Sequence, residues 1–156
     1  IFGESAEELL PLRESMQSND LFLLQSAISA IVGKGQGLTP AGDDFLAGLL
    51  LGVHLFESSS ALSQILCKTI LAACQGKTTR LSMAFLKAAA MGYADERWQV
   101  FFETLCQPDL LSLKEAWSEV ISYGASSGWD MLNGFLWIWE TVFCGVQNSR
   151  ERLQTF

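Results

Sequence analysis

The chain has 156 residues, of which 49% are hydrophobic, enough for one core of ordinary size and too many for intrinsic disorder. Its 17 acidic and 10 basic residues give a formal charge of −7, which repels phosphate backbones, so we expect no nucleic-acid partner. The longest apolar stretch, residues 45–56, is too short for a membrane-spanning helix, which needs about 20 residues. We therefore expect one domain, 1–156, with no membrane span.

The four cysteines lie in apolar stretches and show no Cys-x-x-Cys spacing. We interpret them as reduced core thiols of a cytoplasmic protein, not as a disulfide or zinc framework. No basic segment followed by a short apolar run opens the chain, so nothing indicates secretion. Because the first residue is Ile1, we expect the chain to be the C-terminal part of a longer protein. The cysteines are Cys67, Cys74, Cys106 and Cys144.

Apolar residues recur at helical spacing along nearly the whole chain, and no run of strict alternation typical of strands occurs. The pattern predicts an all-α fold, a compact bundle or array of about 7 to 8 short helices. Helix starts are indicated by Ser5 with Glu8, by Asp20, and by Ser112 with Glu115. The expected helices span about 5–16, 21–32, 43–56, 61–75, 79–92, 96–105, 113–123 and 129–147.

Two loops of small residues, 33–42 and 124–128, interrupt the helical pattern. Residues 40–50 align without a gap on residues 126–136, with identical residues at five of the eleven positions. We infer an internal pseudo-repeat of two similar helix N-termini and consider a pseudo-twofold axis between them. The identical pairs are Gly42/Gly128, Asp44/Asp130, Leu46/Leu132, Gly48/Gly134 and Leu50/Leu136.

A glycine-rich helix start suits a small anionic ligand. The first backbone N–H groups of a helix lack internal partners and carry the positive end of the helix dipole, so anions and carbonyl groups bind there readily. Loop glycines let the backbone approach a ligand, and hydroxyls add further donors. The candidate substrate-binding residues of the two loops are Gly35, Gly37, Thr39, Gly42, Asp43, Ser126, Ser127 and Gly128.

Asp44 and Asp130 are the candidate catalytic carboxylates, since they occupy the repeated position. Neighbouring side chains on a helix point about 100° apart, so we expect Asp44 rather than Asp43 to face the site. Each of Gly48 and Gly134 costs a helix about 1 kcal/mol relative to alanine, which predicts close helix–helix approach beneath the loops. The alternative needs no ligand, because Asp, Ser, Thr and Gly are the ordinary residues of helix starts.

A third polar cluster, Thr78, Thr79, Arg80 and Ser82, stands at another predicted helix start. Its hydroxyls and guanidinium suit an anion, although an N-cap followed by a solvated arginine explains it equally well.

Other sequence features bear on the class of site. His54, the single histidine, is interpreted as a packing residue, and no Ser–His–Asp set exists. Trp129 opens the second repeated helix and is a candidate pocket wall. Neither a Walker loop nor a Rossmann fingerprint is present.

Taken in order, GKGQGLTPAGDDFLAG at 33–48, TTRLS at 78–82 and GASSGWD at 124–130 resemble the bacterial AllH-like family, long catalogued as a domain of unknown function. The resemblance spans about residues 20–140. It implies a subunit of oxamate carbamoyltransferase in ureide and purine breakdown, which interconverts oxalurate and phosphate with oxamate and carbamoyl phosphate. It also implies an FdrA-like partner subunit, with a homo-oligomer as the alternative. We expect no cofactor.

The resemblance does not extend to the aspartate and ornithine carbamoyltransferases, which are α/β proteins with a Ser-x-Arg-Thr phosphate motif. Residues 78–81 read Thr-Thr-Arg-Leu, so that mechanism does not transfer.

Three functions remain open at this stage. The leading hypothesis is a helical domain of a carbamoyltransferase subunit that needs no metal. A Mg²⁺-dependent hydrolase, as in all-α ADP-ribosylglycohydrolases, is the second, because adjacent Asp43 and Asp44 suit this cation. Against it, Ala47 stands where Asp-Asp-x-x-Asp would supply a third carboxylate. The third is a scaffold subunit whose partner holds the catalytic residues.

Overall fold

The computed structural model describes residues 6–57, 60–107 and 109–144. Over these residues the chain forms eight α-helices, a terminal π-helical turn and no strand, which confirms the all-α prediction. None of the helices within these ranges is long and apolar enough to cross a membrane. The elements are α1 (Ala6–Ser18), α2 (Leu21–Ile31), α3 (Ala41–Glu57), α4 (Ala61–Cys74), α5 (Arg80–Ala90), α6 (Glu96–Leu105), α7 (Leu110–Ile121), α8 (Ser127–Ile138) and η1 (Trp139–Cys144).

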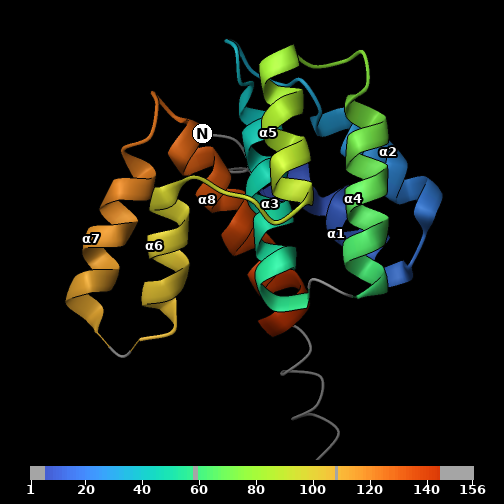
Figure 1. The fold of residues 1–156 in the computed structure, drawn as a ribbon. Coiled ribbons are helices and arrows are strands. Elements are labelled where there is room, and N and C mark those ends of the chain that lie inside the picture. Colours follow the sequence, from blue (N-terminus) through green and yellow to red (C-terminus); the bar gives the residue numbers. More distant parts are fainter. Residues whose placement is uncertain (1–5, 58–59, 108, 145–156) are drawn as a thin grey trace, which may run out of the picture.

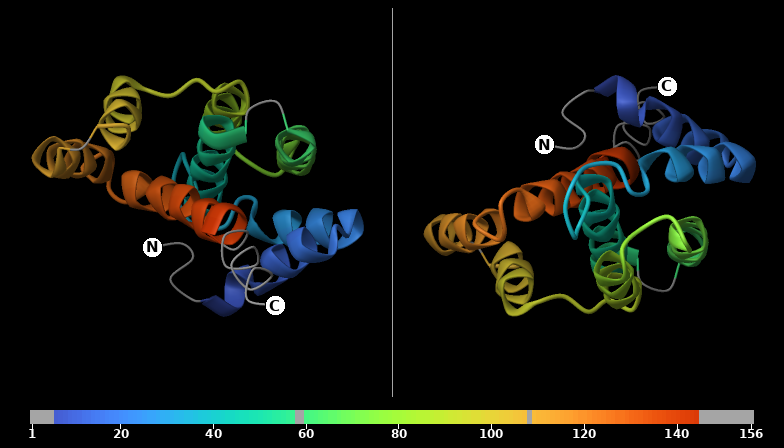
Figure 2. Two further views of the ribbon diagram at one scale, coloured as in Figure 1. Left: turned by 90° about the horizontal axis from the view of Figure 1, so that it is seen from below. Right: turned by 90° about the horizontal axis from the view of Figure 1, so that it is seen from above.

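The helices α3 and α8 cross at the centre of the molecule, and the other helices pack around the crossing (Figures 1 and 2). The pairs α1–α2 and α6–α7 are helical hairpins at opposite ends, and each leads through a small-residue loop into one of the two central helices. This repeated arrangement of hairpin, loop and long apolar helix agrees with the inferred duplication.

Two glycines allow the crossing. A Cβ atom on Gly48 would lie 1.7 Å from the carbonyl oxygen of Met131, and one on Gly134 would lie 1.9 Å from that of Phe45. No side chain fits at either position, because each helix rests directly on the backbone of the other. The predicted close approach beneath the two loops is confirmed.

Gly42 and Gly128 serve packing in the same symmetrical way. Each is the second residue of its helix, and a Cβ atom would lie 2.2 Å from the Ile31 oxygen at Gly42 and 2.0 Å from the Val120 oxygen at Gly128. These carbonyl groups belong to the last turns of α2 and α7. The repeat therefore includes the contact between each central helix and the end of the helix before it.

An aromatic cluster joins α6 to α8. Trp98 and Phe101 are buried, and their rings lie 5.8 Å from the ring of Phe135 between centroids. Phe102 lies 5.6 Å from the same ring. Burying a large apolar side chain stabilises a fold by about 1.5–3 kcal/mol, so this cluster fixes the α6–α7 hairpin on the central helices.

Some helix ends differ from the prediction. Asp20 caps α2 as expected, since its carboxylate accepts two backbone N–H groups of the first turn. The cap of α7 is Asp109, which accepts the N–H of Leu111, so Ser112 was the wrong residue and lies inside the helix. The last helix begins at 127 instead of 129 and continues as η1 after 138. Ser5 lies outside the described residues.

The cysteines are not all core residues. Cys74 is buried, and burial raises the pKa of its thiol to about 12. Cys67 is half-buried, whereas Cys106 is exposed at the end of α6, so its assignment to the core was wrong. An apolar sequence neighbourhood did not predict burial there because α6 ends at the surface. The side chain of Cys144 lies outside the described part.

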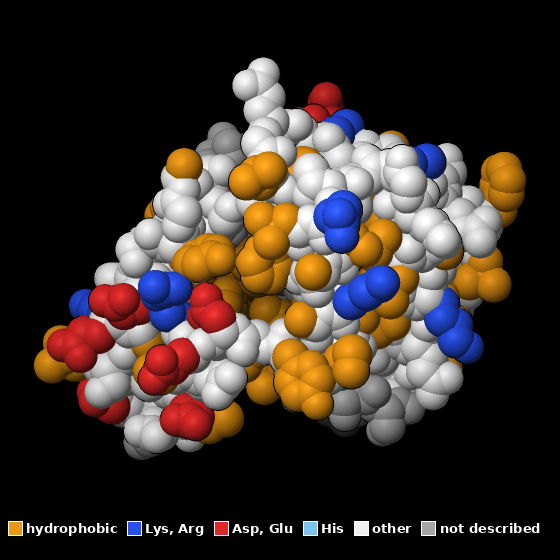
Figure 3. All heavy atoms as spheres, turned by 45° about the horizontal axis from the view of Figure 1, so that its top comes forward, with side chains coloured by type: hydrophobic (Ala, Val, Ile, Leu, Met, Phe, Trp, Pro, Cys, Tyr) orange, Lys and Arg blue, Asp and Glu red, His pale blue; other side chains and the backbone are white. Residues whose placement is uncertain are grey.

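The described surface is uneven in charge. On the face shown in Figure 3, most acidic side chains gather at one side, with a few basic ones among them, and the other lysines and arginines lie mainly at the opposite side. Hydrophobic side chains surround a hollow between these two groups.

Candidate functional site

The two predicted helix starts lie side by side. The hydroxyl oxygens of Thr39, before α3, and Ser127, at the start of α8, are 3.1 Å apart. On the other side of the 33–40 loop, the hydroxyl of Thr79 donates a hydrogen bond to the carbonyl oxygen of Leu38. The loop thus contacts the starts of both α5 and α8, so the three polar clusters found in the sequence lie close together.

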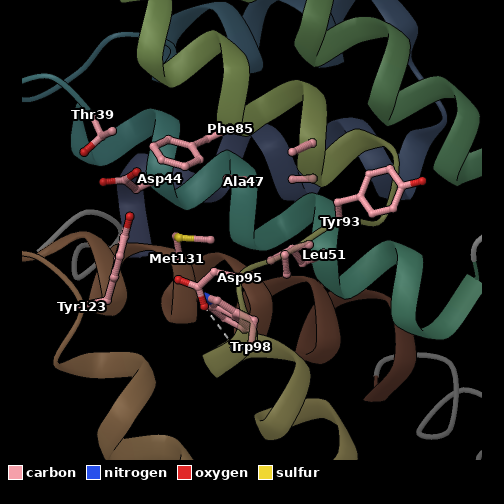
Figure 4. A pocket seen from close by; sticks show the side chains of 13 residues that line it. Thr39, Asp44, Ala47, Leu51, Phe85, Tyr93, Asp95, Trp98, Tyr123 and Met131 are labelled. Atoms are coloured by element: carbon pink, nitrogen blue, oxygen red, sulfur yellow. Dashed lines mark hydrogen bonds between the residues drawn. The ribbon is translucent and has the colours of Figure 1, made fainter.

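A cavity of about 200 Å³ opens beside this junction, between α5 and α6 and above α3 and α8 (Figure 4). Asp44 and Thr39 lie at one end, and the walls carry four aromatic rings and several small apolar side chains. No lysine, arginine or histidine belongs to its lining. The aromatic residues are Phe85, Tyr93, Trp98 and Tyr123.

Asp44 is the notable polar group of the cavity. Its side chain is 6% exposed, and Oδ2 is buried without a hydrogen-bond partner. Burial raises its pKa from 3.8 to about 6, and the negative charges of Asp130 and Asp43 add to the rise, while the hydroxyls of Ser127 and Thr39 oppose it. A carboxyl group with this pKa exchanges its proton near neutral pH.

The second carboxylate of the lining, Asp95, is already engaged. It caps α6 by accepting the N–H groups of Arg97 and Trp98, and it forms an ion pair with the Arg97 guanidinium at 3.3 Å. That guanidinium also lies over the ring of Tyr123, 5.2 Å from its centroid. Asp95 therefore has partners for its carboxylate, whereas one oxygen of Asp44 has none.

Asp43 points away from this cavity and holds the loop instead. One carboxylate oxygen accepts the N–H of Gly33 at 2.8 Å, and the other accepts the hydroxyl of Thr78. Asp43 thus ties the loop to the start of α5. Asp43 was predicted to bind substrate, but it is not among the residues that line the cavity.

Asp130 is fully buried and does not line the cavity. Its charge nevertheless raises the pKa of Asp44, so the repeated carboxylates are close neighbours. Whether Asp130 has a catalytic role stays a prediction.

The backbone amides at the two helix starts are largely used by the protein itself. The N–H of Gly42 donates to the carbonyl of Lys34 at 2.9 Å, and the N–H of Gly128 donates to that of Tyr123 at 3.0 Å. These two glycines therefore offer neither a free amide nor open space. The predicted use of helix amides for an anion gains no support from them.

Gly35 and Gly37 shape the loop, with φ of 108° and 102° that L side chains rarely adopt. Nothing lies within 4 Å of a Cβ atom on Gly37, so space beside it is open. Ser126 precedes α8 without a side-chain capping bond and is exposed. Whether these three positions contact a ligand stays a prediction.

The cluster at the start of α5 belongs to a different hollow. Thr79 caps α5 by accepting the N–H of Ser82, whose side chain is buried. Thr78, Thr79 and Arg80 line a surface hollow of about 670 Å³ together with Lys87. None of these residues lines the cavity at Asp44, because the hollow lies between α4 and α5 whereas the cavity is lined by another face of α5.

Two further expectations concern single residues. Nε2 of His54 lies 2.7 Å from the carbonyl oxygen of Ala90, so this imidazole joins α3 to the end of α5, as a packing residue does. Trp129 is partly exposed and does not line the cavity.

Among the described residues, no group of three or more His, Cys, Asp or Glu side chains is arranged to hold a metal ion. Asp43 and Asp44 diverge, and Asp43 is bound by Gly33 and Thr78. The arrangement needed for the Mg²⁺ hypothesis is therefore not found in this part of the chain.

Sequence reasoning missed the aromatic walls. Phe85, Tyr93, Trp98 and Tyr123 come from α5, the loop after it, α6 and the loop before α8. The sequence offered one signal, because its two tyrosines both stand where a predicted helix ends. Both line the cavity.

Fold and site together define an all-α protein in which two repeated helix starts meet beside a small cavity with a buried carboxylate. A sequence model of the family described as "Oxamate carbamoyltransferase subunit AllH" matches residues 31–139, a range that includes the crossing helices and the whole cavity lining. The chain therefore belongs to the AllH family of oxamate carbamoyltransferase subunits. A subunit implies partner chains. No solved structure matches the chain.

Proposed function

We propose that this chain forms the helical part of an oxamate carbamoyltransferase subunit, and that its cavity binds the nitrogen-bearing end of the substrate. The observation that carries the proposal is Asp44, a residue of the cavity lining whose buried Oδ2 has no hydrogen-bond partner. Leaving a buried acceptor unsatisfied costs about 1–3 kcal/mol, so a ligand N–H at this oxygen would recover that free energy.

The cavity suits an amide or ureido group. A carboxylate only accepts hydrogen bonds, and such groups present N–H donors. The aromatic rings of Phe85 and Tyr123 offer flat apolar walls to a planar group. A volume of about 200 Å³ accommodates a molecule as small as oxamate or oxalurate.

The anionic ends of the substrates need a different environment, because no basic side chain lines the cavity. Hydroxyls of Thr39 and Ser127 stand at its edge, and the amides near Gly37 lie in the adjacent loop. We assign carboxylate and phosphate oxygens to this edge and to groups of a partner subunit, for which the family resemblance suggests an FdrA-like chain.

Asp44 then serves as the proton acceptor. In the synthetic direction the oxamate nitrogen attacks the carbamoyl carbon, the C–O bond to phosphate breaks, and phosphate leaves with the electron pair. The proton lost by the nitrogen passes to the Asp44 carboxylate. A pKa of about 6 suits this role, and in reverse the protonated Asp44 returns the proton to the departing nitrogen.

The test uses the enzyme assembled with its partner subunits and Asp44→Asn, with Asp109→Asn as a control for a capping aspartate outside the site. We expect Asp44→Asn to lower kcat at least about 100-fold, as for loss of a general base. Synthesis by the unchanged enzyme should decline below about pH 6, and phosphorolysis of oxalurate should decline above it. Full activity of Asp44→Asn would contradict the proposal and favour a scaffold role.

A further inference from the structure

Charge is divided between two neighbouring pairs of helices. Residues 61–94, which include α4 and α5, carry four basic side chains and no Asp or Glu, whereas residues 95–121, which include α6 and α7, carry six acidic against two basic. The net charges are thus +4 and −4. The basic residues are Lys68, Lys77, Arg80 and Lys87, and the acidic ones are Asp95, Glu96, Glu103, Asp109, Glu115 and Glu119, all exposed.

An exposed apolar strip lies between the two charged regions. Leu81 and Phe85, one turn apart on α5, are each 43% exposed. Met91 and Tyr93, after the same helix, are 66% and 65% exposed. Figure 3 shows hydrophobic side chains around the central hollow of this face, with most of the acidic groups on one side and most of the basic groups on the other. Exposed apolar side chains gathered in this way mark interaction surfaces.

We propose that two copies of this chain pair face to face through this surface. The twofold axis between them runs along the apolar strip. The rotation exchanges the two charged sides, so α4–α5 of each copy meets α6–α7 of the other, and positive charge faces negative charge twice. The strip packs against itself at the centre. The cavity at Asp44, rimmed by Phe85 and Tyr93, opens on the same face, so the two cavities lie next to the interface.

The order of charges along the face favours a second copy as the occupant. The basic, apolar and acidic zones follow one another across the face. In a second copy turned by 180° their order is reversed, so basic meets acidic and apolar meets apolar. A partner of uniform charge would match one side of the face and repel the other. A head-to-tail stack also pairs opposite charges, but it does not close and would produce longer assemblies.

Charge reversal provides the test. Arg80→Glu/Lys87→Glu lowers the net charge of the basic side from +4 to zero, and Glu96→Lys/Glu119→Lys raises that of the acidic side from −4 to zero. We expect each double variant alone to raise the dimer dissociation constant at least about tenfold, since the attraction between opposite net charges is then lost at both contacts. An equimolar mixture of the two variants should form a heterodimer, because the unaltered acidic side of one variant then meets the unaltered basic side of the other. Sedimentation equilibrium and light scattering measure both effects.

Glu14→Lys on α1, exposed and outside the charged helix pairs, is the matched control and should leave the dimer unchanged. Circular dichroism verifies that all variants are folded. A wild-type chain that stays monomeric at every concentration, assemblies longer than a dimer, or a mixture that fails to pair would each overturn the proposal. A dimer that Leu81→Asp disrupts and rising salt weakens would support it.

Discussion

Replacing Asp44 by Asn should stabilise the protein, and the gain should depend on pH. The pKa of this carboxyl is about 6 in the folded protein against 3.8 ordinarily, chiefly because of burial. A folded-state pKa above the unfolded one means that the folded state loses stability as pH rises from about 4 to about 6. The shift of about two pKa units corresponds to about 3 kcal/mol at pH 7 and to nothing below pH 4.

Asn has the same shape and no charge, so Asp44→Asn removes this cost. We expect the variant to be more stable than the parent at pH 7.5 by up to about 3 kcal/mol, and equal to it near pH 4. In a chain of this size the gain raises Tm by about 6–12 °C. Thermal and urea unfolding at both pH values provide the measurement.

Asp109→Asn is the opposite case and the control. Hydrogen bonds from the Ser112 hydroxyl and the Leu111 N–H lower the pKa of Asp109, so its contribution to stability exists above the ordinary pKa and disappears as pH falls. This variant should lose a little stability at neutral pH. A difference between Asp44→Asn and the parent that is the same at both pH values, or a less stable variant at pH 7.5, would refute the reasoning about burial.

Two further predictions concern packing and exposure. Gly48→Ala should lower the free energy of unfolding in urea by about 3 kcal/mol or more, because its Cβ would meet the Met131 carbonyl. Gly76→Ala, in open space at a φ of 75°, should lower it by about 1 kcal/mol. Equal losses would contradict direct backbone contact at the crossing. With a thiol reagent on the native protein, Cys106→Ser should remove one rapidly labelled group and Cys74→Ser none, since only the first of these thiols is exposed; rapid labelling of Cys74 would contradict its burial.

The helices were largely predictable because their signals are local. Apolar periodicity and the carboxylate of Asp20 depend on residues within one or two turns, which sequence displays directly. Gly48 and Gly134 were informative for the same reason, since a glycine inside an apolar helix is unfavourable unless something needs the space. The cap of α7 was wrong because Asp109 precedes Ser112 by one turn and takes the cap.

By itself, the sequence determined the all-α class, the repeated helix starts, the division of charge and the family resemblance. The sequence also favoured Asp44 over Asp43 as the carboxylate of the site, whereas the tertiary structure directed Arg80 to a separate hollow. It also raised the pKa of Asp44 and gathered Phe85, Trp98 and Tyr123 around one space. These properties depend on how distant helices pack together. The burial of a carboxylate and the electrostatic potential at it are set by groups that lie far apart in the chain.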